Sequence, residues 1–232
     1  MLRLVSKIIS VSIGIALPCA TYADVFQAST SIESSRFLGG ISLSNDEPAV
    51  SLAVDWTSDT GAFAGGDCAT SSVNNSEGIK SNCDFYAGYF SSITPKQSVS
   101  VQFTRHEYSR GFDRRWDFHD VSASWHVNKK TTFSATYSKN WLNFAYDSLD
   151  LKGATQLALT NRLNLNLSAS ILALEDPSPV ETLTYGKASF SYAFERWTAE
   201  AGIVIGDSDQ ELFLPFDFDQ PDFSLTFTYR LY

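Results

Sequence analysis

The sequence predicts an all-β fold, namely a transmembrane antiparallel up-and-down β-barrel of 12 strands. The first of three observations behind this prediction is the C-terminal segment 221–232, in which apolar and polar residues alternate. Because successive side chains of a strand point to opposite sides, Phe223 and Phe227 share one face and Ser224 and Thr226 the other. A half-buried strand of a soluble protein gives the same pattern, so the other two observations have to decide.

The second observation is an export signal at residues 1–23. Arg3 and Lys7 form a short basic region, residues 8–17 an apolar core, and residues 21–23 a small-x-small cleavage motif. The apolar core is far shorter than the roughly 20 residues that a transmembrane helix needs. We therefore expect cleavage before Asp24, a barrel built from residues 24–232, and a final location in the cell outer membrane.

The third observation is the order of the connections between alternating segments. Five are short, at residues 58–61, 94–97, 128–130, 160–162 and 195–196. Between them lie six longer ones, at residues 37–46, 69–82, 109–116, 143–148, 175–181 and 207–220. Outer-membrane barrels show this asymmetry, with short turns in the periplasm and long loops outside. Eleven connections give an even number of strands, with both termini on the periplasmic side.

The predicted strands are close to the 9–11 residues that cross a bilayer at a tilt. They span residues 25–36, 47–57, 62–68, 83–93, 98–108, 117–127, 131–142, 149–159, 163–173, 182–194, 197–206 and 221–232. Their polar faces are rich in Asn, Ser and Thr, which do not form a dry core. We therefore assign the polar face to a wet lumen and the apolar face to lipid. The strands at 62–68 and 83–93 leave this assignment open, because Phe85 and Tyr89 compete with Tyr86 and Phe90.

The alternation predicts which polar and charged side chains line the lumen. The pore-lining candidates are Glu33, Asp55, Gln102, His106, Asp120, His126, Asp150, Lys152, Gln156, Lys187, Glu200 and Arg230. Arg105 and Lys139 have the opposite, lipid-facing parity at the outer ends of their strands, where a charge costs only about 0 to 1 kcal/mol. We expect these two to contact lipopolysaccharide.

Charge and cysteine content narrow the function classes. Removal of the signal leaves 15 of the 17 Lys and Arg residues against 26 Asp and Glu residues, a formal charge of −11. Nucleic acid is not an expected partner, because no basic stripe is present to neutralise phosphates. Cys68 and Cys83 bracket a polar segment and, in an exported protein, are expected to form a disulfide across one loop. No metal or cofactor is expected.

The tryptophans provide a check on the layout, because indole rings favour membrane interfaces. Trp56, Trp125 and Trp197 fall at the periplasmic strand ends, and Trp116 and Trp141 at the outer ends. The sequence therefore predicts two aromatic girdles.

The first hairpin carries a family resemblance. The stretch from Ser34 to Ala49, followed by Asp55, Trp56 and residues 61–65, resembles the N-terminal signature of the TorF family of porin-like proteobacterial proteins. The matching positions are Gly40, Ile41, Ser42, Pro48, Ala49, Asp55, Gly61, Ala64 and Gly65. Arg36 and Gly39 stand where the signature has an aromatic residue and an arginine. The resemblance implies passive transport, and it names no substrate.

Function follows from the lumen rather than from the fold. Mixed charges along a pore select small solutes without a chemical step, which indicates a porin-like channel. The carboxylates around the final two long connections indicate weak cation selectivity. The alternatives are a plugged barrel that acts as a scaffold or adhesin through its loops, and an outer-membrane hydrolase. The hydrolase would depend on His106, His119 or His126, and the sequence has no Gly-x-Ser-x-Gly motif. Besides lipid and solutes, the expected partner is the barrel assembly machinery, which would engage the final strand near Tyr229 and Leu231.

The predicted topology can be tested by labelling single cysteines in intact cells. A membrane-impermeant maleimide should reach cysteines placed at Ser178 and Asp209, which lie in long connections. It should not reach cysteines placed at Asn128 or Asn161, which lie in short turns. Labelling with the opposite polarity would contradict the 12-strand layout.

Overall fold

The computed structural model describes residues 24–38, 41–42, 47–70, 81–108, 117–141, 146–175, 181–208 and 222–231. The predicted export signal lies outside these ranges, as do most residues of the long connections. No helix in the described part of the chain is long and apolar enough to span a membrane.

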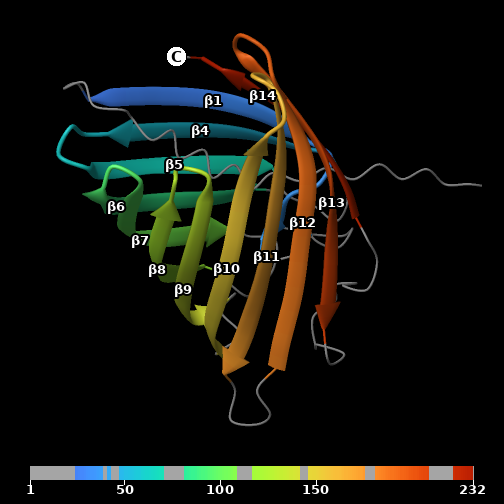
Figure 1. Cartoon of the computed structure of the whole chain (residues 1–232). Coiled ribbons are helices and arrows are strands. Elements are labelled where there is room, and N and C mark those ends of the chain that lie inside the picture. The colour runs from blue at the N-terminus through green and yellow to red at the C-terminus, as the bar shows by residue number, and fades with distance from the viewer. Residues whose placement is uncertain are drawn as a thin grey trace, which may run out of the picture.

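Twelve antiparallel strands form one closed barrel, as predicted, in which chain neighbours pair and β1 pairs with both β4 and β14 (Figure 1). The barrel strands are β1 (Val25–Glu33), β4 (Ala49–Thr57), β5 (Ala62–Thr70), β6 (Ser81–Thr94), β7 (Gln97–Tyr108), β8 (Phe118–Val127), β9 (Thr131–Trp141), β10 (Tyr146–Ala158), β11 (Leu163–Glu175), β12 (Glu181–Ala193), β13 (Trp197–Ser208) and β14 (Asp222–Arg230). Two short strands, β2 (Phe37–Leu38) and β3 (Ile41–Ser42), pair with each other outside this order. Closure leaves the barrel without a free sheet edge.

The two faces of the barrel wall differ as the alternation predicts. Large apolar side chains are exposed on the outer face, among them Val101, Phe103 and Val121. The buried set is mostly polar and includes Ser31, Thr226 and other hydroxyl side chains. A soluble protein would place these two sets the other way round, because exposed apolar surface in water is costly. An apolar outer wall around a polar interior is the arrangement that fits a barrel in lipid.

One end of the barrel, here named the turn end, carries the five tight connections and the termini of the barrel. At the β4–β5 turn, the Ser58 amide donates to the Ala62 carbonyl at 2.8 Å and Gly61 has a φ of 95°. A Cβ at Gly61 would lie 2.2 Å from the Phe90 carbonyl oxygen, so a side chain does not fit there. The β8–β9 turn has Asn128 and Lys129 at φ 52° and 57°, and the Lys130 amide donates to the Val127 carbonyl at 3.1 Å, which is the geometry of a type I′ turn. The opposite end is named the loop end.

The structure settles the orientation of β5 and β6, which the sequence left open. Phe85 and Tyr89 face outward and are exposed, while Tyr86 and Phe90 face inward. Cys68 and Cys83 are register partners on the outward face, and they form the predicted disulfide near the loop end. The bond links the two strands that lead into and out of residues 71–80.

Two sequence predictions need correction at the loop end. The first strand does not continue to residue 36: it ends at Glu33, and residues 34–37 are buried. Trp141 is not part of an outward aromatic girdle, because it is only 4% exposed. Asn140 before it has a φ of 52°, and the β9–β10 register shifts beside it, so the alternation of faces breaks at this point. The turn-end tryptophans Trp56, Trp125 and Trp197 are exposed on the outer face, as predicted, and Trp116 lies outside the described residues.

The disulfide closes a loop of 15 residues, and in the chain-entropy model this stabilises the fold by about 3 kcal/mol. Reduction should therefore lower the free energy of unfolding by about 3 kcal/mol. The measurement is urea unfolding of the refolded barrel with and without reductant. A Cys68→Ala/Cys83→Ala variant serves as the control, and a reductant effect that persists in this variant would contradict the assignment.

Candidate functional site

The candidate site is the charged interior of the barrel near the loop end, and it starts from the residues that follow β1. Ser34, Ser35, Arg36 and Phe37 are all buried, so this segment turns into the barrel rather than away from it. Phe37 packs against Val204, an inward residue of β13. We name residues 34–37 the inward segment. The contact between Phe37 and Val204 holds this segment against the inner face of β13.

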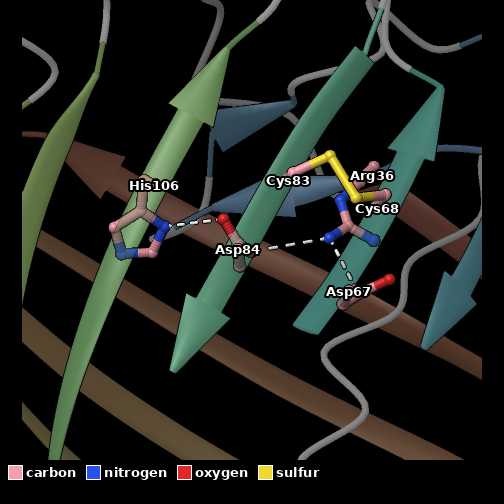
Figure 2. The surroundings of a disulfide bond; sticks show 6 residues. All are labelled: Arg36, Asp67, Cys68, Cys83, Asp84 and His106. Carbon is pink, nitrogen blue, oxygen red and sulfur yellow. Dashed lines mark hydrogen bonds and ion pairs between the residues drawn. A yellow bond between two sulfur atoms is a disulfide. The ribbon is translucent and has the colours of Figure 1, made fainter. Parts of the chain in front are cut away.

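Arg36 is the centre of an ion-pair network inside the barrel. Its guanidinium lies 2.7 Å from the carboxylate of Asp67 on β5, 3.6 Å from Asp84 on β6 and 3.8 Å from Glu33 on β1. Figure 2 shows Arg36 between Asp67 and Asp84, with the disulfide beside it. The network therefore holds the inward segment to three strands of the wall.

The neighbouring carboxylates favour the charged form of Arg36. Burial alone would lower the pKa of its guanidinium, and the neighbouring charges of Asp67, Glu33 and Asp84 raise that pKa by more, so it lies above its ordinary value. Arg36 is thus a permanent cation in an interior that would otherwise concentrate carboxylates. It lowers the repulsion among them.

His106 on β7 extends the network along the wall. Its Nδ1 lies 2.8 Å from a carboxylate oxygen of Asp84, and its Nε2 lies 2.7 Å from Asp120 on β8. Because ionised carboxylates only accept hydrogen bonds, both ring nitrogens donate when both aspartates are ionised, which makes the ring an imidazolium. The ring also stacks on Phe118, with centroids 4.2 Å apart. Arg36 and His106 then face four carboxylates, so the network as a whole is negative.

A second polar group lies on the opposite part of the wall, on β10 to β13. Asp150 accepts hydrogen bonds from the hydroxyls of Ser170 and Tyr185. Lys187 forms an ion pair with Glu200. Lys152 is an inward cation of the same region, with register partners Ser134 and Ser170.

The predicted pore-lining residues divide into three groups in the structure. Seven belong to the two polar groups on the inner wall, namely Glu33, His106, Asp120, Asp150, Lys152, Lys187 and Glu200. Three more interact locally on the inner face: Asp55 accepts a hydrogen bond from Tyr86, Gln102 donates to Thr104, and His126 lies against Ser100 and Thr132. Gln156 and Arg230 are exposed near the turn end. Gln156 donates a hydrogen bond to Asn166, and this bond is also exposed.

Sequence reasoning missed Arg36, Asp67 and Asp84, which the structure places at the centre. Asp67 and Asp84 each adjoin a cysteine of the disulfide and are register partners of one another. A lipid-facing disulfide places both aspartates on the inner face by alternation. This signal was present in the sequence but depended on the strand parity that remained open. The burial of Arg36 had no comparable signal.

One serine–histidine contact in the structure bears on the hydrolase alternative. The Ser100 hydroxyl lies 3.1 Å from His126 Nε2, and the other ring nitrogen contacts the hydroxyl of Thr132 rather than a carboxylate. A neutral hydroxyl stabilises a developing imidazolium much less than a carboxylate does. His106 is engaged by two aspartates, and His119 lies on the outer face against Phe103.

Comparison with known proteins assigns the chain to a family. Residues 20–176, more than half of the chain, match the family described as a bacterial protein of unknown function, Gcw_chp. The chain belongs to this family. The description does not carry the TorF name, so that resemblance stays a prediction. No curated protein matches the sequence.

Solved structures resemble the fold. A structure titled KdgM porin matches with a TM-score of 0.53 and 9% identity, covering 90% of this chain and 100% of that one. A structure titled KdgM porin in complex with disordered oligogalacturonate matches with the same values. OmpT of Vibrio cholerae follows at a TM-score of 0.46 and 10% identity, with coverages of 89% and 97%. At such identities the likeness concerns the fold alone, which is that of outer-membrane porin barrels.

The ion-pair network should contribute measurably to stability. Replacing Arg36 by Gln leaves carboxylates close together in a buried region, and we expect a loss of about 2 kcal/mol, below the 3 to 5 typical of fully buried pairs because Asp67 is partly exposed. The measurement is urea unfolding in lipid vesicles. An Arg230→Gln variant, with its side chain exposed near the turn end, should change stability by less than about 0.5 kcal/mol. Combining Arg36→Gln with Asp67→Asn should cost less than the sum of the single changes, and strict additivity would contradict the network.

Proposed function

We propose that the protein is an outer-membrane channel that lets small solutes diffuse passively, with a weak preference for cations. The single observation that carries the proposal is the polar, charged interior of a closed barrel whose outer wall is apolar. The likeness in fold to the KdgM porin supports it. The loop end then faces the outside of the cell and the turn end the periplasm, in line with the usual loop asymmetry.

Twelve strands give an interior intermediate between barrels that side chains fill and barrels that leave an open channel. The inward segment takes up part of that interior. The same observation favours a second candidate, a barrel sealed by the network that acts as a scaffold through its loops. The two candidates differ in one property, the passage of ions.

The preference for cations follows from the inner charges. Carboxylates outnumber the permanent cations on the described inner face and inward segment. They are Glu33, Asp55, Asp67, Asp84, Asp120, Asp150, Glu200 and Asp222, against Arg36, Lys152, Lys187 and Arg230. Arg36 and Lys187 form ion pairs with carboxylates, and Arg230 lies at the exposed turn end. A negative interior raises the local cation concentration.

Planar-bilayer recording of the refolded protein tests the proposal. Discrete conductance steps are expected, and a bilayer that stays sealed despite verified insertion would favour the scaffold. In a potassium chloride gradient, the reversal potential should show cation preference that declines as salt rises, because the screening length is only about 10 Å at 0.1 M.

Charge variants separate the inner field from other sources of selectivity. Replacing Asp67 and Asp84 by Asn should reduce the cation preference at low salt. Glu107→Gln is the matched control, because Glu107 is a carboxylate of β7 on the outer face. Anion preference of the wild type at low salt would show that Lys152 and Lys187 govern passage instead.

A further inference from the structure

The Lys and Arg side chains that face outward from the described strands lie close together near the loop end. The described strands contain five Lys and Arg residues, of which Lys152, Lys187 and Arg230 face inward. The other two, Arg105 on β7 and Lys139 on β9, face outward near the loop end. Cations on a lipid-facing wall are otherwise avoided, so their position calls for a physical reason.

The register shows that these two cations belong to one row. Arg105 is the register partner of His119 on β8, and His119 is the register partner of Lys139. Directly opposed residues of neighbouring strands have their Cβ atoms about 5 Å apart. The three side chains therefore stand side by side across three strands. All three are exposed, and the Arg105 side chain is 61% exposed. We name Arg105, His119 and Lys139 the basic row.

A row of apolar side chains lies directly beneath the basic row, on the side of the membrane interior. It consists of Phe103, Val121, Tyr137 and Leu149, register neighbours on β7 to β10 that are each 41–48% exposed. The surface thus pairs a line of cations with an apolar strip below it. A lipid with phosphates above acyl chains has the complementary pattern.

Two described carboxylates lie beside the basic row, Glu107 next to Arg105 and Asp147 within electrostatic range of Lys139. Glu107 pairs with Arg105 Nε at 2.7 Å and lies two residues closer to the loop end. Among the residues that the structure describes, this leaves the two outer nitrogens of the guanidinium for another acceptor. Asp147 accepts hydrogen bonds from the Tyr137 hydroxyl and the Asn140 amide. A planar guanidinium with free nitrogens is suited to phosphate, which it can bind through two hydrogen bonds.

We propose that the basic row binds the phosphates of lipid A, and that the apolar row beneath it receives the acyl chains. The occupant is lipid A rather than a phospholipid because the row lies at the loop end, which faces the outer leaflet in the orientation given above. Lipid A presents two phosphates on one rigid disaccharide, which matches cations at both ends of a row. The site is separate from the lumen, so it does not depend on whether the barrel conducts.

The test is the thermal stability of the refolded mature protein in detergent, with and without purified lipid A. Lipid A should raise the melting temperature of the wild type. Arg105→Ala/Lys139→Ala should lose at least half of that increase. Lys96→Ala/Lys130→Ala is the matched control, because it removes two exposed lysines near the turn end. Equal increases in all three proteins would overturn the proposal.

Measurements with other lipids identify the ligand, and a charge-preserving variant controls for a folding defect. Dephosphorylated lipid A should give little increase in the wild type, and an undiminished increase would show that acyl chains alone bind. Phosphatidylglycerol should give a smaller increase than lipid A, and an equal one would overturn the choice of lipid A. The charge-preserving Arg105→Lys/Lys139→Arg variant should keep most of the increase. His119→Gln should lose part of it, and no loss would remove His119 from the site.

Discussion

The ion pairs of Arg36 are the interaction on which the interior of this barrel depends. Strand pairing closes the wall, but it does not decide what occupies the space inside. Arg36 draws the inward segment against β1, β5 and β6 and offsets carboxylates that would otherwise repel one another. Phe37, in contact with Val204, anchors the same segment on β13. This short segment therefore takes up part of the lumen and adds one cation to its charged interior.

The inward segment contacts the strands that also carry the disulfide on their outer face. Cys68 and Cys83 face outward, and Asp67 and Asp84 beside them face inward, so the disulfide fixes the strand pair that presents both carboxylates to Arg36. His106 and Asp120 continue the charged line onto β7 and β8. On the outer face of these two strands and of β9 lies the basic row. One part of the barrel thus carries both the inward segment with its ion pairs and the basic row on the outer face.

The sequence predicts most of the wall, because alternation has a period of two and each strand is long enough to show it. The number of strands, the closure and the disulfide are confirmed. The parity of β5 and β6 could not be predicted, since these strands carry aromatic residues on both faces, with Phe85 outside and Tyr86 inside. The positive φ at Asn140, which turns Trp141 inward, has no sequence signature of its own. The inward segment was missed for a related reason: a buried arginine is recognisable only when its carboxylate partners, distant in sequence, are known to be close in space.

The central claim is that residues 34–37 lie inside the barrel, and cross-linking in native membranes tests it most directly. Phe37→Cys combined with Val204→Cys, treated with a short bismaleimide, should give an internal cross-link, because the two positions are in contact inside the barrel. Phe37→Cys combined with Ile203→Cys is the matched control, since Ile203 is the adjacent residue and faces outward. Cross-linking of the first pair alone is the predicted result. Equal yields for the two pairs, or a higher yield for the second, would show that the segment does not lie in the lumen.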